Sequence, residues 1–428
     1  MRPTTRSTEL YNRARELLPG GVNSPVRAMR AIGRDPIFIS DGSGARITDV
    51  DGNDYIDWVC SWGPLILGHA HPAIVDAVAE AVSSGTSFGA PTQGEVQLAA
   101  EIAARIPSAQ MVRMTSSGTE ATMSALRVAR AATAREKVLK FAGAYHGHLD
   151  GLLAEAGSGL ATQGIPASPG VPQAATQATV VVPWNDPDAV VEATERHELA
   201  AILAEPAPAN MGVVPPAEGF LELLRQRADA TGALLIFDEV ISGFRVARGG
   251  VQEISGILPD LTILGKVLGG GLPAAAFGGP PALMELLAPA GDVYQAGTLS
   301  GNPLAVAAGY ETLRLLDGRA YRKLEQTTEA LADGLRAAAA SAGCDVQVQS
   351  LPGLLTVFFA REPVRDYSDA RGSDLNAFAT FARALLDRGI YPPPSQFEAW
   401  FPSLAHSHED VERTIRAARE AFQEAAAQ

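Results

Sequence analysis

The sequence predicts an α/β fold with a large domain built on a doubly wound, mainly parallel sheet and a smaller α+β domain formed by both chain ends. Between residues 72 and 309, short apolar runs of strand length alternate with stretches of helical period, which is typical of a parallel sheet covered by helices on both faces. Before and after that region, turn signals and mixed strand and helix patterns favour a second unit. A chain of 428 residues can bury two such cores.

The N-terminal segment, residues 1–71, is expected to belong to the small domain. An amphipathic helix is predicted near residues 7–18 from the spacing of its apolar side chains. A small antiparallel meander is predicted over residues 36–58, with turns at Asp41-Gly42 and Asp51-Gly52, because Asp-Gly is a strong hairpin signal.

The large domain, residues 72–309, is predicted to carry seven strands, each an apolar run bounded by polar or turn-forming residues. These strands are 111–115, 137–141, 179–182, 200–204, 233–237, 261–264 and 274–277. The C-terminal part, residues 310–428, is expected to pack on the N-terminal meander. It is predicted to contain a helical passage over 309–342, strands near 346–349 and 354–359, and helices near 373–387 and 408–427.

Composition and charge restrict the possible partners. The formal net charge is −14, and Lys and Arg are not clustered, which argues against a nucleic-acid partner. No apolar stretch is long enough to span a bilayer and the N-terminus lacks an apolar signal core, so we expect no membrane partner and a cytoplasmic location.

The cysteines and histidines do not form an obvious metal site. Cys60 and Cys344 are far apart and are expected to be reduced core thiols. Three close histidine pairs lack a cysteine or an acidic residue at ligand spacing, so they are interpreted as loop or capping residues and no metal is predicted. These pairs are His69 with His71, His146 with His148, and His406 with His408.

One lysine and one aspartate occupy the ends of two predicted strands. Lys266 follows the apolar run 261–264 and precedes the glycines at 269–271, and Asp238 directly follows the run 233–237. Because the carboxyl ends of parallel strands open into one crevice, we expect these two side chains to meet there. A buried lysine can react with a carbonyl group, and an aspartate can keep a pyridine nitrogen protonated. The pair therefore predicts a site for pyridoxal 5'-phosphate.

A candidate phosphate site precedes the predicted helix 121–132. The segment Ser117-Gly118-Thr119 follows the strand 111–115, so its backbone N–H groups and hydroxyls lie where a helix N-terminus attracts an anion. Taken alone, the segment is equally typical of an ordinary Ser N-cap with Glu120 in the first turn. Beside the predicted cofactor pair, phosphate binding is the preferred interpretation.

Three further segments are candidates for the same site. Tyr145 follows a predicted strand and could stack on the cofactor ring, with a core tyrosine as the alternative. Thr298 precedes a helix and either caps it or contacts phosphate. Residues 148–177 form a long Gly-, Ser-, Ala- and Pro-rich segment without a sustained period, which we interpret as a lid, with a plain surface insertion as the alternative.

These motifs resemble those of the class III family of pyridoxal-phosphate-dependent aminotransferases, which have fold type I. The shared segments are 117–121, Asp238-Glu239-Val240 with Gly243-Phe244-Arg245, and Gly265-Lys266. A narrower resemblance, to the glutamate-1-semialdehyde 2,1-aminomutases, lies in 19–28, 205–206 with 210–216, the Gly-rich segment after His148, and 395–399. The resemblance implies a fold-type I transferase that uses pyridoxal 5'-phosphate and pyridoxamine 5'-phosphate.

The resemblance, carried over position by position, implies roles for individual residues. Lys266 would bond covalently to the cofactor aldehyde, Asp238 would pair with the ring nitrogen, and Tyr145 would stack on the ring. The other cofactor-binding residues implied are Ser117, Gly118 and Thr119 at the phosphate, Glu205 and Asn210 beside the ring, and Thr298 at the phosphate of a neighbouring subunit.

The implied substrate pocket is lined by Ser24, Arg27 and Trp62. Arg27 would hold the substrate carboxylate, since a guanidinium can bind both oxygens and stays charged. Glu398 would lie near the amino-bearing carbons and act in catalysis with Lys266 and Asp238. The chain departs from the family pattern at Pro392-Pro393 and at Trp400, so we expect the pocket wall near Glu398 to differ, which leaves the substrate size open.

The implied reaction is the isomerisation of (S)-4-amino-5-oxopentanoate to 5-aminolevulinate through 4,5-diaminovalerate, for tetrapyrrole synthesis. Lys266 would move a proton between substrate and cofactor carbons, and a lid would retain the diamine. A homodimer is implied by the phosphate contact between subunits. The alternatives are a class III aminotransferase acting on another amino ketone or β-amino acid, and a non-catalytic homologue with a binding role.

Overall fold

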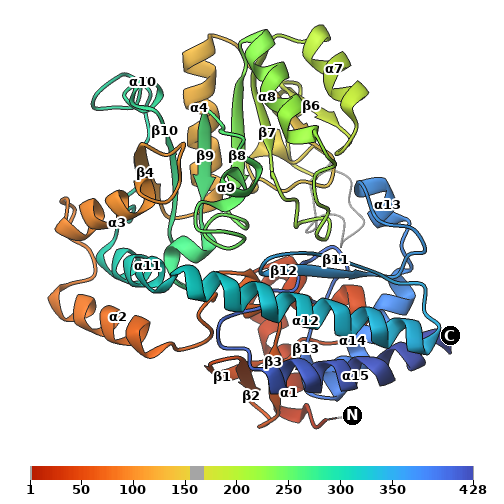
Figure 1. The fold of residues 1–428 in the computed structure, drawn as a ribbon. Helices are drawn as coiled ribbons and strands as arrows, with labels where there is room; N and C mark the ends of the chain where they lie inside the picture. Colours follow the sequence, from red (N-terminus) through yellow and green to blue (C-terminus); the bar gives the residue numbers. More distant parts are fainter. Residues whose placement is uncertain (1, 155–167, 428) are drawn as a thin grey trace.

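A seven-stranded sheet organises the larger part of the computed structural model, which describes residues 2–154 and 168–427 (Figure 1). The strand order is β4-β10-β9-β8-β7-β5-β6; from β9 to β6 all neighbours run parallel, and β10 is antiparallel to both β9 and β4. The strands are β4 (Met111–Thr115), β5 (Lys137–Phe141), β6 (Thr179–Val182), β7 (Leu199–Ala204), β8 (Leu234–Glu239), β9 (Leu261–Leu264) and β10 (Ala275–Gly279). Each lies within two residues of its predicted bounds, and the mainly parallel, doubly wound sheet is confirmed.

Helices cover both faces of this sheet because successive strand residues point to opposite sides. On β5, Val138 packs into the cluster that includes α4 (Gly118–Thr133), whereas Leu139 packs into the cluster that includes α7 (Pro187–Arg196) and α8 (Phe220–Thr231). On β8, Ile236 packs into the cluster that includes α4, and Leu235 packs into the cluster that includes α7 and α8. The strands are therefore apolar on both faces, as the continuous apolar runs of the sequence predict.

The remaining helices of the large sheet lie mostly along its β4 edge and at its strand ends (Figure 1). Helix α11 packs against both α2 and α3, and its first turn is capped by the Asn302 side chain, which accepts from the Ala305 N–H at 3.0 Å. The bounds are α2 (Pro72–Ser84), α3 (Gln93–Ala103), α6 (Gln173–Thr176), α9 (Gly250–Ser255), α10 (Pro281–Met284) and α11 (Pro303–Leu315), with short 3-10 turns η5 (Asp150–Leu152) and η6 (Lys266–Gly269).

The two chain ends share a second sheet and a second core. Strands β1 (Ile39–Ser43), β2 (Arg46–Asp49) and β3 (Asp54–Asp57) form the predicted antiparallel meander, and β13 (Ile390–Tyr391) joins it parallel to β3. The core includes Trp58, Leu335, Phe381 and Phe422, so both ends contribute. The other elements here are α1 (Thr5–Leu17), η1 (Pro19–Gly21), η2 (Pro25–Ala28), η3 (Arg30–Ile32), η4 (Cys60–Trp62), α12 (Gly318–Ala342), β11 (Gln347–Leu351), β12 (Leu354–Phe358), α13 (Tyr367–Arg371), α14 (Leu375–Asp387) and α15 (His408–Ala426).

The domain division at residues 71/72 and 309/310 stays a prediction. One local prediction is wrong, and the helical passage is confirmed with a short interruption. Asp41-Gly42 is not a turn: it lies inside β1, and the chain reverses at Gly44 instead, where φ is 56°. Gly42 is needed for packing, since a Cβ there would lie 2.8 Å from Nδ1 of His69. The helical passage 309–342 is divided between α11 and α12, because the Asp317 carboxylate caps a new helix.

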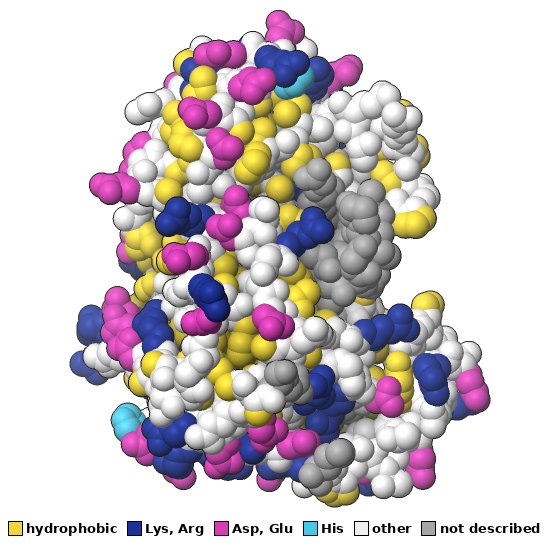
Figure 2. All heavy atoms as spheres, turned by 90° about the vertical axis from the view of Figure 1, so that its right-hand side faces the viewer, with side chains coloured by type: hydrophobic (Ala, Val, Ile, Leu, Met, Phe, Trp, Pro, Cys, Tyr) yellow, Lys and Arg dark blue, Asp and Glu magenta, His cyan; other side chains and the backbone are white. Residues whose placement is uncertain are grey.

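The helices and one face of the surface bear on the partners that the sequence excludes. Among residues 2–154 and 168–427, none of the helices has both the length and the apolar character needed to cross a bilayer. On the face shown in Figure 2, Lys and Arg side chains are scattered among Asp and Glu rather than gathered in one patch.

Candidate active site

A pocket of about 210 Å³ opens at the carboxyl ends of β8 and β9. Asp238, at the end of β8, and Lys266, just after β9, both line it, because the two strands are parallel neighbours in register. The other lining residues are Gly118, Thr119, Thr122, Tyr145, His146, Gly147, Glu205, Asn210, Val240 and Ile241. The meeting of Asp238 and Lys266, which their positions at strand ends predict, is thus present in the structure.

Lys266 has an unusual backbone and a perturbed amine. Its φ is 49°, a left-handed backbone conformation that is disfavoured for residues other than glycine. Burial lowers the pKa of the Lys266 ammonium, and the carboxylates of Asp238, Glu398 and Glu205 oppose that shift only in part. A lowered pKa increases the fraction of neutral amine, which is the form that reacts with a carbonyl carbon.

Asp238 is held by a histidine that sequence reasoning missed. The carboxylate is 5% exposed; its Oδ1 accepts from the Val240 N–H at 3.1 Å, and its Oδ2 lies 2.8 Å from Nδ1 of His146. His146 is 1% exposed, and its Nε2 has no hydrogen-bond partner among the described residues. His146 does lie in a loop, as the sequence predicts, but its contact with Asp238 was not predicted. Its place just beyond β5, at the same sheet edge as Asp238, is the signal that could have found it.

The N-terminus of α4 supports both interpretations of residues 117–119. The Ser117 hydroxyl accepts from the Glu120 N–H at 3.3 Å, and the Glu120 carboxylate accepts from the Ser117 N–H at 2.9 Å, so Ser117 is a helix cap. Gly118 and Thr119 line the pocket instead, and at the first two helical positions their N–H groups have no acceptor within the helix. These N–H groups are suited to an anion.

Glu205 joins three of the predicted cofactor residues into one network. Its side chain is 4% exposed and accepts from the Tyr145 N–H at 2.8 Å and from Nδ2 of Asn210 at 2.9 Å. Burial raises the pKa of Glu205. Tyr145 is still 37% exposed while it lines the pocket, so it is accessible to a bound ring.

The predicted substrate residues lie mainly in a second pocket. Arg27 and Trp62 both line a cavity of about 530 Å³, and Ser24 lines an adjoining one that shares Val22 and Asn23 with it. Glu398 does not line the cofactor pocket, but it lies close enough to Lys266 for its carboxylate to oppose the lowering of that amine's pKa.

Thr298 is exposed and lies outside both pockets of its own chain, and its predicted contact with a neighbouring subunit stays a prediction.

A left-handed turn connects the two pockets. Four consecutive residues have positive φ: Cys60 at 46°, Ser61 at 58°, Trp62 at 69° and Gly63 at 110°. For each of the three that are not glycine, the left-handed conformation costs roughly 1–2 kcal/mol. Ser61 and Trp62 line the Arg27 pocket, while a Cβ added to Gly63 would lie 3.5 Å from Cδ of Lys266. Strain of this kind is concentrated at functional sites.

The departures from the family pattern lie outside the two pockets. Trp400 is 1% exposed and packs in the core shared by the two chain ends, with its ring centroid 6.3 Å from that of Trp58, and it lines neither the cofactor pocket nor the Arg27 pocket. The large indole of Trp400 fits there because it packs into this core rather than into a cavity. The expectation that the pocket wall near Glu398 differs stays a prediction. Pro392 and Pro393 are buried, and neither lines the Arg27 pocket, which Pro394 does.

The predicted lid, residues 148–177, is described only near its two ends. Residues 155–167 lie outside the described residues, so the lid stays a prediction. Before them, Nζ of the buried Lys140 donates to the carbonyl oxygens of Leu152 at 3.1 Å and Ala154 at 3.3 Å, which ties this end of the segment to β5.

Comparisons with known proteins identify the family. The family described as aminotransferase class-III matches residues 29–421. This chain belongs to the class III aminotransferase family. The family and the fold type that the sequence motifs imply are therefore confirmed.

Several relatives of this class III chain are known. It is 57% identical to the glutamate-1-semialdehyde 2,1-aminomutase of Roseiflexus castenholzii over 422 residues, 98% of this chain and 97% of the relative. An omega-transaminase from Sphaerobacter thermophilus has a TM-score of 0.90 at 35% identity, covering 99% of this chain and 98% of that one. A variant glutamate-1-semialdehyde-aminomutase from Pseudomonas aeruginosa PAO1 in complex with PMP has a TM-score of 0.87 at 30% identity, covering 98% and 94%.

Proposed function

We propose that this chain is a glutamate-1-semialdehyde 2,1-aminomutase, which isomerises (S)-4-amino-5-oxopentanoate to 5-aminolevulinate through 4,5-diaminovalerate. The observation that carries the proposal is sequence identity. More than half of the residues are identical to those of glutamate-1-semialdehyde 2,1-aminomutases along nearly the whole chain. The fold alone does not choose the reaction, because transaminases share it. The product would enter tetrapyrrole synthesis, and the cytoplasmic location expected from the sequence stays a prediction.

The residues of the smaller pocket fit pyridoxal 5'-phosphate and pyridoxamine 5'-phosphate. Gly118 and Thr119 offer N–H groups at a helix N-terminus for the phosphate. Gly147 brings its loop against that helix, since a Cβ there would lie 2.4 Å from Oγ1 of Thr119. The buried Asp238 carboxylate suits a protonated ring nitrogen, and Tyr145 offers an open aromatic face.

The chain's own groups divide the chemistry among them. When bound, the cofactor supplies the group that exchanges the amine and a ring that accepts electrons from a broken C–H bond. Lys266, with its lowered pKa, is placed to take and return the proton at the reacting carbon. Asp238, held by His146, would pair with a protonated ring nitrogen of the bound cofactor. Arg27 binds the substrate carboxylate in the cavity of about 530 Å³, where Trp62 forms part of the wall.

The decisive experiment supplies semialdehyde to the cofactor-loaded protein with no other amino donor or acceptor. We expect sustained formation of 5-aminolevulinate, because the amine leaves and returns within one substrate molecule. A class III aminotransferase acting on another amino ketone or β-amino acid would stop after one equivalent per site and resume when an acceptor is added. A non-catalytic homologue would form no product under either condition.

We propose that the active form is a homodimer, assembled through α2, α3 and the segment before α11. Helix α2 has no buried residue, and Val75 on it is 50% exposed. Val96 on α3 is 70% exposed and Tyr294 near Thr298 is 72% exposed. Because α11 packs against both helices, Val75 and Val96 belong to one region of the molecule. Exposed apolar surface of this kind favours a protein partner, and a second copy would bring Thr298 to its neighbour's phosphate site.

Val96→Asp is expected to shift the protein towards monomer and to lower its activity at micromolar concentration, because a charge at the interface must be desolvated. Sedimentation velocity measures the shift. Leu375→Asp is the matched control, since Leu375 is also an exposed apolar residue, 43% exposed, but lies at the start of α14 in the small domain. A wild-type protein that is monomeric and fully active would refute the dimer proposal.

A further inference from the structure

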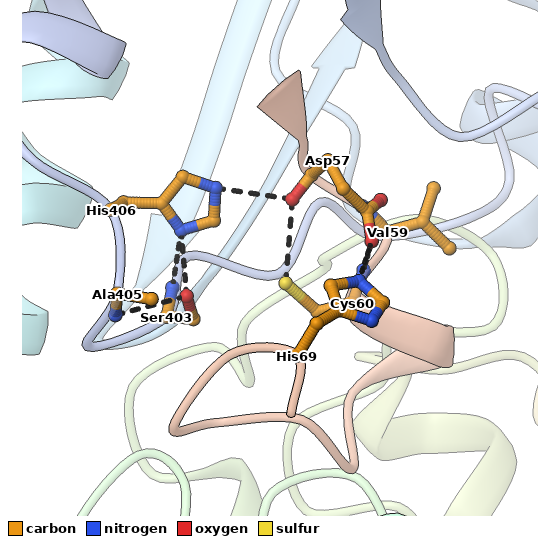
Figure 3. Close-up of polar contacts among 7 residues, drawn as sticks. All are labelled: Asp57, Val59, Cys60, His69, Ser403, Ala405 and His406. Atoms are coloured by element: carbon orange, nitrogen blue, oxygen red, sulfur yellow. Dashed lines mark hydrogen bonds and ion pairs between the residues drawn. The ribbon is translucent and has the colours of Figure 1, made fainter. Parts of the chain in front are cut away.

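The left-handed turn at residues 60–63 is held by the carboxylate of Asp57. Asp57 ends β3 and is 2% exposed. Its Oδ1 accepts from the Val59 N–H at 2.8 Å, and its Oδ2 accepts from the Cys60 N–H at 3.1 Å, so one side chain fixes the first residue of the turn and the residue before it (Figure 3). Within the turn, the Trp62 N–H donates to the Val59 carbonyl at 2.8 Å.

Two histidines fix Asp57 in turn (Figure 3). Nε2 of His69 lies 2.7 Å from Oδ2 of Asp57. His406 accepts the Ser403 N–H on its Nδ1 at 3.0 Å, so its Nε2 carries the proton and donates to the Asp57 carbonyl oxygen at 3.1 Å. The His406 ring also stacks on Trp58, with centroids 3.9 Å apart. Asp57 is therefore fixed at both its side chain and its backbone.

The far end of the turn is held from the large domain. The carbonyl oxygen of Gly63 accepts a hydrogen bond from the buried guanidinium of Arg245, and a Cβ at Gly63 would lie 2.8 Å from Cε1 of Phe401. Between the two fixed ends lie Ser61 and Trp62, which line the same pocket as Arg27. Residues other than glycine disfavour the left-handed region, and the contacts to Asp57 and Arg245 thus hold Cys60, Ser61 and Trp62 in it.

Asp57 itself is not a free anion in that pocket. It lines the cavity with Arg27, but its two oxygens already accept from Val59, Cys60 and His69. The Arg27 guanidinium therefore remains available to a substrate carboxylate, and the contribution of Asp57 is made through the backbone that it holds.

We propose that Asp57 is a positioning residue for the substrate: its carboxylate holds the turn 60–63 in the strained conformation that places Ser61 and Trp62 beside Arg27. The inference rests on the proposed function, because it takes the Arg27 pocket as the substrate site. It assigns to Asp57 an effect on substrate binding, exerted through Ser61 and Trp62, rather than a direct role in the cofactor pocket, which Asp57 does not line.

The test compares Asp57→Asn with Asp49→Asn in the cofactor-loaded enzyme. Asp49 is 1% exposed and accepts the Asp51 N–H at 3.0 Å and the Asn53 N–H at 2.8 Å, so it too holds a turn of the small sheet, but it lines neither pocket. We expect Asp57→Asn to raise KM for the semialdehyde about tenfold with kcat within about threefold, as loss of uniform substrate binding does. Asp49→Asn should leave both constants near those of the wild type, and neither variant should change the visible spectrum of the cofactor.

The buried thiol of Cys60 gives a second measurement that does not depend on the substrate. The chain has two cysteines, so a Cys344→Ser background leaves Cys60, which is 0% exposed, as the single reporter. Asp57→Asn should speed its reaction with a soluble thiol reagent, because the turn opens, whereas Asp49→Asn should not. His69→Leu, which leaves the two backbone contacts of Asp57 in place, should raise KM in the same direction by less, about threefold; it replaces Asp57→Asn if that protein does not fold.

An unchanged KM, or a Cys60 that reacts no faster than in Asp49→Asn, overturns the positioning role. Failure of the proposed function is recognised separately, because the wild-type enzyme would then form no 5-aminolevulinate from semialdehyde alone, while the labelling experiment would still report whether Asp57 holds the turn.

Discussion

Lys266→Ala is expected to lower kcat for 5-aminolevulinate formation by roughly 10⁴-fold, the upper range for loss of a general acid–base group. Lys266 lines the pocket beside Asp238, and burial lowers the pKa of its ammonium. No other lysine lines this pocket, so nothing in the described residues can replace the amine that moves the proton. Product formation, measured with added pyridoxamine 5'-phosphate, gives the result directly.

The matched control for this prediction is Lys323→Ala, whose amine contacts the Leu404 carbonyl on an exposed part of the surface. That variant should keep wild-type kcat. Borohydride should fix the cofactor to the wild-type and Lys323→Ala proteins but not to Lys266→Ala, which should still bind the cofactor without a covalent bond. Full activity of Lys266→Ala would contradict the assignment of the site.

The sequence predicts the cofactor pair well because the rule involved is local. A side chain that directly follows an apolar strand lies at the carboxyl edge of a parallel sheet, wherever that strand falls in the strand order. Asp238 and Lys266 both satisfy this condition, and the register of β8 and β9 brings them to one pocket. The same rule places Tyr145 after β5 and Glu205 after β7.

Contacts between distant parts of the chain were not predictable in this way. His146 and Asp238 are 92 residues apart, and His406 and the Asp57 carbonyl are 349 apart. The strand order of the large sheet sets the first contact and the packing of the two chain ends sets the second, and the spacing of the histidine pairs in the sequence shows neither. The strained turn at residues 60–63 is similarly hidden, because Cys60, Ser61 and Trp62 are not residues that favour positive φ, and tertiary contacts impose it.

Glycines are ambiguous for a related reason. Asp41-Gly42 and Asp51-Gly52 have the same sequence signal, but only the second is a turn. Gly42 lacks a side chain because His69 packs over it, which is a long-range requirement. A glycine in a sequence thus indicates either a bend or a close approach, and only packing distinguishes the two.

Asp238→Asn is expected to lower kcat by roughly 10²- to 10³-fold, the range for losing one group that stabilises the charge developing in the transition state. Asparagine keeps the shape of the side chain and can still bond to His146, but it cannot carry the negative charge that favours a protonated ring nitrogen. The variant should therefore also bind pyridoxal 5'-phosphate more weakly, which an absorbance titration measures.

Asp260→Asn separates this electrostatic effect from a general loss of sheet stability. Asp260 accepts from the Leu235 N–H at 2.7 Å and lies before β9, at the opposite edge of the sheet from Asp238. Its replacement should lower the melting temperature while leaving kcat within about twofold, since it touches neither pocket. If Asp238→Asn kept the kcat and cofactor affinity of the wild type, the charge at position 238 would have no role in the reaction. The reaction would then depend on proton transfer by the Lys266 amine alone, without a carboxylate paired to the ring nitrogen.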